Sequence, residues 1–440
     1  MPSILVVADD LTGAMDTAHG FAVRGHHVRV AIGADRIPEA TVVAVNTNSR
    51  YAGPERAAET VRDVVAERSE RMYKKIDSTL RGNVVAEVDA AVDASGADVA
   101  LVTPAFPAAG RTTRSRIHRV DGTPVTETEY AADENGPTTA DLLALLSASR
   151  YRTDHVGTDV VERGPDAIAA TIGPDRPVLV ACDAVTDDHL AAIARSDERI
   201  DGRVLFVGSG GLAAHVRVEP GGPEPDSDDD RDRGGRNDET GHENEAELER
   251  EAPVSVPGSA GRNVLGIVGS VNETTLSGLA AVPEDDLVPV DPEAAVDDPE
   301  RAGRTAGETA AERLERGKRA VVTAAPTKAA VETALAAGSA RGYEPAAVRA
   351  RIARALATAA RTAVESEQPA GLFVTGGDVA VIVFEALEAT TLSLSPEAVE
   401  AGIPIGVVDD GVAGGVPVVT KAGGFGTSET VINCLRTLCS

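Results

Sequence analysis

The apolar positions of this chain are grouped in short continuous runs, and longer amphipathic stretches separate the runs. In the first half the runs cover residues 4–8, 28–32, 42–45, 99–103, 178–181 and 204–207. Continuous hydrophobicity, in place of strict alternation, is typical of strands that are buried on both faces, as in a parallel sheet covered by helices. The first half of the chain is therefore predicted to be an α/β domain.

The same rhythm resumes in the second half, with apolar runs at residues 264–268, 320–323, 372–375, 405–408 and 416–420. Helical patterns lie between the runs, for example at residues 54–68, 299–316, 345–365 and 427–438. At 440 residues the chain is also too long for one ordinary core. The sequence predicts two α/β domains with mainly parallel sheets.

An acidic stretch separates the two halves. Residues 219–251 hold 14 acids and four arginines with almost no apolar side chain. Such a composition cannot bury enough surface to offset the entropy lost on ordering. We predict a disordered linker or surface insertion at 218–261, between a domain at 1–217 and a domain at 262–440.

Acids also dominate the whole chain, with 70 Asp and Glu against 42 Lys and Arg, a net charge of −28 and only five lysines. This field repels nucleic acid and anionic membrane surfaces, so neither is predicted as a partner. The acid-rich, lysine-poor composition favours a halophilic protein, because a salt-rich cytoplasm screens the self-repulsion.

Cysteine use and the start of the chain bear on the compartment. The three cysteines lack metal-type spacing and fit a reducing environment. No basic segment precedes the first apolar run, and no run approaches the length of a membrane span. The expectation is a cytoplasmic protein without a membrane span and without metal-ligating residues.

Two carboxylates, Asp9 and Asp10, follow the first apolar run and precede a helical pattern. At the carboxyl end of a strand they can ligate a cation, hold sugar hydroxyls or accept a proton. The alternative is that Asp10 or Thr12 only caps the helix, which accounts for one acid but not for two.

Residues 74–83, Lys-Lys-Ile-Asp-Ser-Thr-Leu-Arg-Gly-Asn, form a denser polar block. In this lysine-poor chain the block is suited to an anionic ligand. Arg81 can grip a carboxylate with two bonds, Lys75 can neutralise a transferring phosphate, and Asp77 completes the candidate site. A structural ion pair between Asp77 and Arg81 is the alternative. The polar cluster at 46–50, which ends in Arg50, suits a polyhydroxylated acid but is nearly as typical of a plain turn.

Three glycine-bearing turns follow apolar runs of the second half, at residues 269–272, 376–379 and 422–426. Glycine lets the backbone approach a phosphate, and a helix start after the turn offers free N–H donors. Single turns of this kind are weak signals, but three at equivalent strand ends favour a nucleotide site. No Walker loop and no dinucleotide fingerprint occurs in the sequence.

Together these motifs resemble those of the four-carbon acid sugar kinase family, whose members phosphorylate threonate, erythronate or 3-oxo-tetronate at the terminal hydroxyl. The resemblance rests on residues 8–14, 74–83, 104–113 and the Gly-Gly-Phe-Gly at 423–426, which occur in the family's order. It covers nearly the whole chain apart from the acidic insertion.

The resemblance implies an N-terminal sugar-acid domain and a C-terminal ATP domain that uses ATP with Mg²⁺. The residues expected near the nucleotide are Ser270, Gly376, Gly377, Asp378, Val379, Gly423 and Gly424. The family usually has Gly-Gly-Glu-Thr at 376–379 and Lys-Ser-Gly at 421–423, so hydroxyls are lost here, while phosphate binding by the backbone would survive. A homodimer is one option for the assembly.

The predicted function is an ATP-dependent kinase for a four-carbon sugar acid. In this hypothesis Asp9 or Asp10 orients the terminal hydroxyl and accepts its proton, while Arg81 and Lys75 hold the anionic end. The altered nucleotide turns keep a second class open, a non-catalytic sugar-acid sensor with a degenerate ATP site. A nicotinamide-dependent oxidoreductase is disfavoured by the missing fingerprint.

Overall fold

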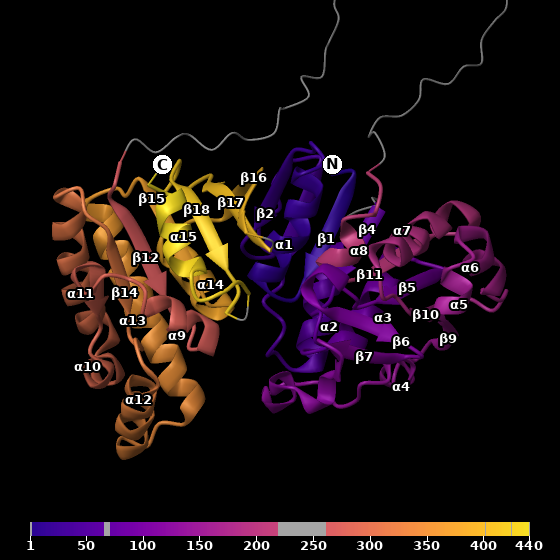
Figure 1. The fold of residues 1–440 in the computed structure, drawn as a ribbon, viewed down its shortest axis with the longest axis horizontal. Helices are drawn as coiled ribbons and strands as arrows, with labels where there is room; N and C mark the ends of the chain where they lie inside the picture. Colours follow the sequence, from indigo (N-terminus) through magenta and orange to yellow (C-terminus); the bar gives the residue numbers. More distant parts are fainter. Residues whose placement is uncertain (1, 66–70, 219–260, 401, 424, 440) are drawn as a thin grey trace, which may run out of the picture.

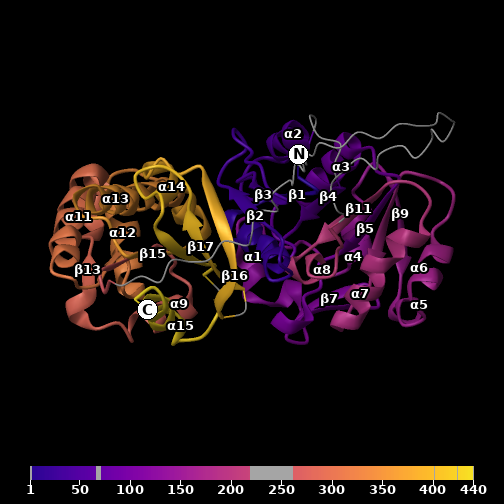
Figure 2. The same ribbon diagram turned by 90° about the horizontal axis from the view of Figure 1, so that it is seen from above.

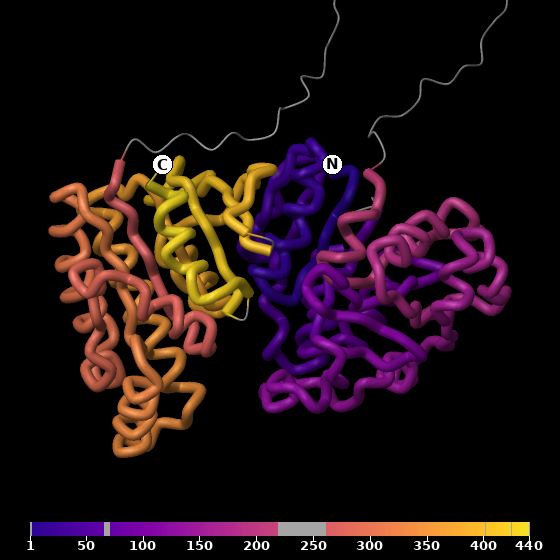
Figure 3. Tube along the Cα trace, in the orientation of Figure 1, coloured from indigo at the N-terminus to yellow at the C-terminus, as the bar shows by residue number. Residues whose placement is uncertain are grey.

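The computed structural model describes residues 2–65, 71–218, 261–400, 402–423 and 425–439. Two α/β domains stand side by side, the first coloured indigo to magenta and the second orange to yellow (Figures 1 and 3). The fold class predicted from the apolar runs is thus confirmed. The predicted linker at 218–261 lies outside the described residues except at its two ends.

The N-terminal domain is built on eight parallel strands in the order β2-β3-β1-β4-β11-β5-β10-β9. The strands are β1 (Ile4–Ala8), β2 (Val28–Ala31), β3 (Val42–Asn46), β4 (Arg71–Lys75), β5 (Val99–Thr103), β9 (Arg152–Val156), β10 (Val178–Cys182) and β11 (Val204–Gly208). The helices are α1 (Leu11–Ala22), α2 (Pro54–Val65), α3 (Val84–Ser95), α4 (Leu142–Leu146), α5 (Thr158–Val161), α6 (Pro165–Thr171), α7 (Asp187–Arg195) and α8 (Gly210–Ala213). A small antiparallel sheet follows β5 and comprises β6 (Arg111–Arg114), β7 (Ile117–Val120) and β8 (Thr123–Pro124).

The C-terminal domain contributes seven strands in the order β13-β14-β12-β15-β18-β17-β16. They are β12 (Val264–Val268), β13 (Leu287–Pro289), β14 (Ala320–Thr323), β15 (Gly371–Thr375), β16 (Thr391–Glu400), β17 (Ile403–Val408) and β18 (Pro417–Lys421). The helices are α9 (Glu273–Leu279), α10 (Pro292–Asp297), α11 (Pro299–Glu315), α12 (Lys328–Ala340), α13 (Pro345–Ser366), α14 (Gly377–Ala386) and α15 (Thr430–Thr437). The strands from β13 to β18 are parallel, whereas β16 and β17 run antiparallel to their neighbours.

The two half-sheets join edge to edge. Strand β16 pairs antiparallel with β2, with Leu392 opposite Val30, so that one sheet of 15 strands crosses both domains. Helix α1 lies along this seam (Figure 2), and its Met15 accepts a hydrogen bond from Thr420 Oγ1 at 2.9 Å. His19 Nε2 lies 3.2 Å from the Pro396 carbonyl oxygen. The seam therefore fixes α1 between the carboxyl ends of the N-terminal strands and the second domain.

Several elements differ from the sequence expectation. Helix α15 begins at Thr430 in place of residue 427, and the last residues of the helix predicted at 54–68 lie outside the described residues. Strands β4, β9, β13 and β16 and the small sheet were not predicted. Most of these strands lie at an edge or carry several polar residues, as Arg71–Lys75 does, so they lack a continuous apolar run.

Small residues compensate for the scarcity of aromatic side chains, which make up 2% of the chain. The longest helices, α11 and α13, approach each other at two glycines. A Cβ on Gly303 would overlap the Ala355 carbonyl oxygen, and a Cβ on Gly307 would lie 2.7 Å from the Ala359 carbonyl oxygen. The backbones thus pack too closely for any side chain at these two positions.

This close approach reverses the usual effect of glycine on helix stability. Alanine normally stabilises a helix by about 1 kcal/mol relative to glycine. We expect Gly303→Ala instead to lower the free energy of unfolding by about 1–3 kcal/mol, because its Cβ forces α11 and α13 apart. Urea denaturation measures the change. Gly20→Ala in α1 is the control, since its Cβ would lie 3.7 Å from Ala214 Cα, an ordinary contact. A stabilised Gly303→Ala would contradict the packing.

Candidate active site

Asp9 and Asp10 end the loop from β1 into α1. Asp10 caps the helix, because its Oδ1 accepts a hydrogen bond from Gly13 N at 3.0 Å, and its Oδ2 accepts one from Thr12 Oγ1 at 2.7 Å. Asp9 is buried, and its Oδ1 has no hydrogen-bond partner among the described residues. The capping alternative is therefore correct for Asp10, but the cap is only part of what this carboxylate does.

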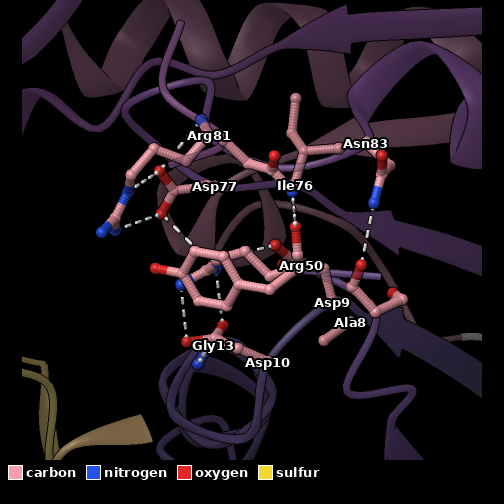
Figure 4. A network of polar contacts seen from close by, with 12 residues as sticks. Ala8, Asp9, Asp10, Gly13, Arg50, Ile76, Asp77, Arg81 and Asn83 are labelled. Atoms are coloured by element: carbon pink, nitrogen blue, oxygen red, sulfur yellow. Dashed lines mark hydrogen bonds and ion pairs between the residues drawn. The ribbon is translucent and has the colours of Figure 1, made fainter. Parts of the chain in front are cut away.

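Arg50 links the acids of three segments (Figure 4). Its Nε donates to Asp9 Oδ2 at 2.7 Å, and one terminal nitrogen donates to Asp10 Oδ2 at 2.9 Å. The other terminal nitrogen lies 2.8 Å from Asp10 Oδ1 and 3.5 Å from Asp77 Oδ1. One buried guanidinium thus holds together the ends of β1, β3 and β4.

Asp77 and Arg81 form the structural ion pair that was the alternative for this block. Arg81 Nε donates to Asp77 Oδ2 at 2.8 Å, and a terminal nitrogen donates to Oδ1 at 3.0 Å. The remaining nitrogen lies 3.5 Å from Asp133, and the guanidinium stacks over Tyr130 at 5.3 Å. Arg81 is thereby oriented, with part of its surface exposed beside the acid cluster.

The two adjacent lysines point in different directions, as successive residues of a strand must. Lys74 is buried and pairs with Glu87 at 2.7 Å, so its role is structural. Lys75 Nζ donates to the Ile76 carbonyl oxygen at 2.8 Å. A Cβ on Gly13 would lie 2.9 Å from Lys75 Nζ, which places the ammonium at the start of α1. Only Lys75 of the pair reaches the candidate site.

The charges of the cluster set the protonation of its acids. Burial alone would raise the pKa of Asp10, but Arg50 and Lys75 outweigh burial and lower it. For Asp77 burial acts in the same way, yet Arg81 and Arg50 hold the pKa well below the ordinary range. Both acids are therefore anionic at neutral pH and well matched by nearby cations.

The predicted nucleotide turns lie together at the carboxyl ends of three adjacent parallel strands, β12, β15 and β18. A Cβ on Gly376 would lie 3.1 Å from Ser270 N, and one on Gly423 would lie 2.6 Å from Ser270 Oγ. Gly376 also has φ of 101°, a conformation that favours glycine. Val379 packs against Gly269, so its side chain is structural. Gly424 lies outside the described residues.

Helix α14 begins directly at the second of these turns. No side chain caps it among the described residues, so the N–H groups of its first turn, at Gly377, Asp378 and Val379, stay available to an anion. Burial is the main reason that the pKa of Asp378 is raised, with Arg50 acting in the opposite direction and Asp10 adding to the rise. These two influences place Asp378 within electrostatic reach of the N-terminal acids.

Lys421, at the end of β18, was not predicted as a site residue. It is buried, and its Nζ donates to Thr275 Oγ1 and to the Gly423 carbonyl oxygen, each at 3.0 Å. Burial lowers its pKa to about 8. Lys421 thus holds the Gly423 turn in place. The sequence signal that could have identified Lys421 is the scarcity of lysine, since the chain has only five.

The two groups of residues meet across the seam. A Cβ on Gly377 would lie 3.6 Å from Asp10 Oδ2 and 3.8 Å from Thr12 Oγ1. The glycine turn of the C-terminal domain therefore faces the acid cluster of the N-terminal domain directly. Arg50, which sequence reasoning treated only as part of a polar turn, is at the centre of that cluster.

Two further searches of the described residues bear on the class of site. In the ranges that the structure covers, no group of three or more His, Cys, Asp or Glu side chains is arranged to hold a metal ion. None of the described helices combines the length and apolar character that crossing a membrane requires. The protein is thus a two-domain α/β protein in which a charged strand edge of one domain lies near a glycine-turn edge of the other.

Comparison with known proteins gives the family. A sugar-binding N-terminal domain model matches residues 4–216, and a nucleotide-binding C-terminal domain model matches residues 265–431. A D-threonate kinase of Bordetella bronchiseptica is 33% identical over 99% of this chain and 98% of its own length. The chain belongs to the four-carbon acid sugar kinase family, as the motifs indicated.

Other relatives also bear the names of kinases for four-carbon sugar acids. A D-threonate kinase of Salmonella typhimurium is 29% identical over 98% of this chain and 97% of its own, and a D-erythronate kinase of Heliobacterium modesticaldum is 28% identical over 99% and 97%. A solved Salmonella typhimurium structure has the same fold at 19% identity, with a TM-score of 0.74 over 98% of both chains. A Haemophilus influenzae structure reaches 0.67 at 18% identity over 99% and 100%. The relatives' activities support a kinase role for this chain.

Removing Arg50 should disrupt the cluster more than removing an ordinary surface charge. We expect Arg50→Met to lower the free energy of unfolding by about 3–5 kcal/mol, because three acids that share one buried cation lose it. Chemical denaturation measures the loss. Arg36→Met is the matched control, since Arg36 is 75% exposed and lies 3.7 Å from Asp410; it should change stability by less than about 1 kcal/mol. Equal effects of the two substitutions would contradict the central role of Arg50.

Proposed function

We propose that this chain is an ATP-dependent kinase that phosphorylates the terminal hydroxyl of a four-carbon sugar acid of the threonate, erythronate or 3-oxo-tetronate type. The single observation that carries the proposal is the close approach of Gly377 to Asp10 and Thr12 across the seam. A kinase needs an acceptor hydroxyl and a γ-phosphate within reach of each other, and the two candidate edges lie near each other at this point.

The domain at 1–217 takes the sugar acid in this proposal. Lys75 and the exposed part of Arg81 attract the carboxylate end, and Asp10 orients the terminal hydroxyl toward Gly377. Asp9 and Asp77 act mainly by fixing Arg50 and Arg81, to which their oxygens are bound. The match of this half to a sugar-binding domain model supports the assignment.

The domain at 262–440 takes the nucleotide. The backbone N–H groups at the start of α14 and at Ser270 and Gly423 suit phosphate oxygens, and such binding does not depend on the hydroxyls that this chain lacks. Residues 218–261 connect the two domains. The match of the second half to a nucleotide-binding domain model supports this role.

The residues present also fit a magnesium ion that arrives with ATP. Mg²⁺ in kinases is held by one or two carboxylates together with phosphates and water, so a cluster of three acids is not required. Asp378, whose pKa is influenced by Arg50 and Asp10 across the seam, would hold it. When bound, the ion neutralises phosphate charge. The transition state of phosphoryl transfer spreads negative charge over oxygens, and Lys75 and Arg50 supply positive charge beside it.

A substrate panel tests the proposal. Purified protein, assayed in high salt because of its acidic composition, should release ADP from ATP and Mg²⁺ only when a four-carbon sugar acid is added. Asp10→Asn should lower kcat at least about 100-fold, because alignment of the hydroxyl is lost. Thermal denaturation of the variant checks that the fold persists. Binding of the acid without ATP binding in calorimetry would instead indicate a sensor.

Lys421 gives a prediction specific to the nucleotide side. Lys421→Met removes the hydrogen bonds that hold the Gly423 turn, so KM for ATP should rise about tenfold, which corresponds to about 1.4 kcal/mol. KM for the sugar acid should stay unchanged. Steady-state kinetics with each substrate varied separately measure the two values. A rise confined to the sugar acid would place Lys421 outside the nucleotide site.

A further inference from the structure

Asp16 lies nearly two turns beyond the Asp10 cap on helix α1, and its carboxylate occupies the seam between the domains. A Cβ on Gly210, at the start of α8, would overlap Asp16 Oδ2, and a Cβ on Gly402, after β16, would lie 3.5 Å from Oδ1. The carboxylate is thus bounded by one glycine from each domain. At both positions a Cβ would clash with a neighbouring atom, at Gly402 with the Phe425 ring, so only glycine fits beside the carboxylate.

The Asp16 carboxylate has no partner among the described residues. In the part of the chain that the structure describes, no hydrogen bond and no ion pair within 4.0 Å reaches this carboxylate. By contrast, both oxygens of Asp10 already accept bonds from Gly13, Thr12 and Arg50. Asp16 is only partly buried, so its carboxylate is open to a hydrogen bond from a substrate group.

The charged group that faces Asp16 is Lys75, which acts on it from β4 at more than ion-pair distance. Lys75 Nζ donates to one carbonyl oxygen and has further protons to give. A hydroxyl placed between the two can donate to Asp16 and accept from Lys75. The acid cluster and the start of α14 lie next to the same helix.

The surroundings of Asp16 give it a different acidity from Asp10. Burial raises the pKa of Asp16 to about 6, with Lys75 lowering it and Asp10 raising it further. The Tyr73 phenol also faces it from β4. Gly210 of α8 and Gly402 of the second domain, which lie beside it, and Phe425, which packs against Gly402, are uncharged. Asp16 is therefore the acid of the site whose proton affinity is closest to neutral pH.

We propose that Asp16 accepts the proton of the sugar-acid hydroxyl as that hydroxyl attacks the γ-phosphate of ATP. The inference rests on the proposed kinase function. The hydroxyl oxygen forms a bond to the γ-phosphorus, and the bond from that phosphorus to the β,γ-bridging oxygen breaks, so that its electron pair leaves with ADP. The proton passes to Asp16 and then to solvent. Asp10, whose oxygens are already bound, orients the hydroxyl but does not take the proton.

A pH profile of the wild-type enzyme and two variants tests this role. The kcat/KM of the wild type should fall below about pH 6 with a slope of about one, because protonated Asp16 cannot accept a proton. Asp16→Asn should lower kcat by about 10²–10⁴-fold and abolish that acidic limb, with little change in either KM. Asp16→Glu should restore part of the rate with a displaced limb. Asp63→Asn, an exposed change on α2, should behave as wild type.

Thermal denaturation supplies a readout that does not depend on turnover. A carboxyl whose pKa is raised by folding destabilises the fold once the unfolded state is ionised, so the penalty is absent below about pH 4, grows between about pH 4 and pH 6, and is complete above about pH 6. Asp16→Asn should thus melt at a higher temperature than wild type near pH 8, and the difference should be smaller near about pH 5 and vanish near about pH 4.

Each other outcome counts against the proposal in a different way. Wild-type kcat in Asp16→Asn, or an acidic limb that persists in it, would overturn the role of Asp16 while leaving the kinase function standing. A lower melting temperature of Asp16→Asn at each of these pH values would indicate a structural role. A wild-type protein that turns over no acid of the panel would overturn the proposed function, and this role with it.

Discussion

The site depends on one buried guanidinium shared by three acids. Arg50 reaches Asp9 and Asp10 from the loop after β3 and lies 3.5 Å from Asp77, so three strand ends are fixed relative to one another. Buried ion pairs of this kind add little net stability, because desolvation of the charges offsets their attraction. Their effect is geometric: with the acids committed to Arg50 and Arg81, Lys75 stays available to an incoming anion.

Helix α1 connects this edge of the N-terminal sheet to the second domain, so the candidate site has residues from both domains. Its spacing of three to four residues places Thr12, Asp16 and His19 on related faces that turn toward the second domain. Each meets a different partner there: Gly377, Gly402 and the Pro396 carbonyl oxygen. The two acids differ in pKa because their surroundings differ. Arg50 and Lys75 lower the pKa of Asp10, while burial raises the pKa of Asp16 to about 6. Similar carboxylates thereby acquire different chemistry.

Sequence patterns predicted the features that depend on neighbouring residues in the chain. They missed the features that depend on contacts between segments far apart in the sequence. Continuous apolar runs located most buried strands, the residues after the first run gave Asp9 and Asp10, and the dense polar block at 74–83 gave Asp77 and Arg81. Strand β4 was missed because Lys74 is buried through a partner, Glu87, that no local pattern reveals. Asp16 reads as an ordinary helix acid until the fold places glycines of both domains against it. Arg50 was likewise visible only as part of a turn.

The seam also explains how two domains can form one site across an acidic segment of unrelated composition. The pairing of β16 with β2, the Thr420–Met15 hydrogen bond and the close approach of Gly377 to Asp10 all involve residues outside 219–260. Non-covalent contacts between the two folded domains therefore set the position of the acids relative to the glycine turns. The segment that connects the domains can therefore be as acidic as the rest of the chain without changing the positions of the residues of the candidate site.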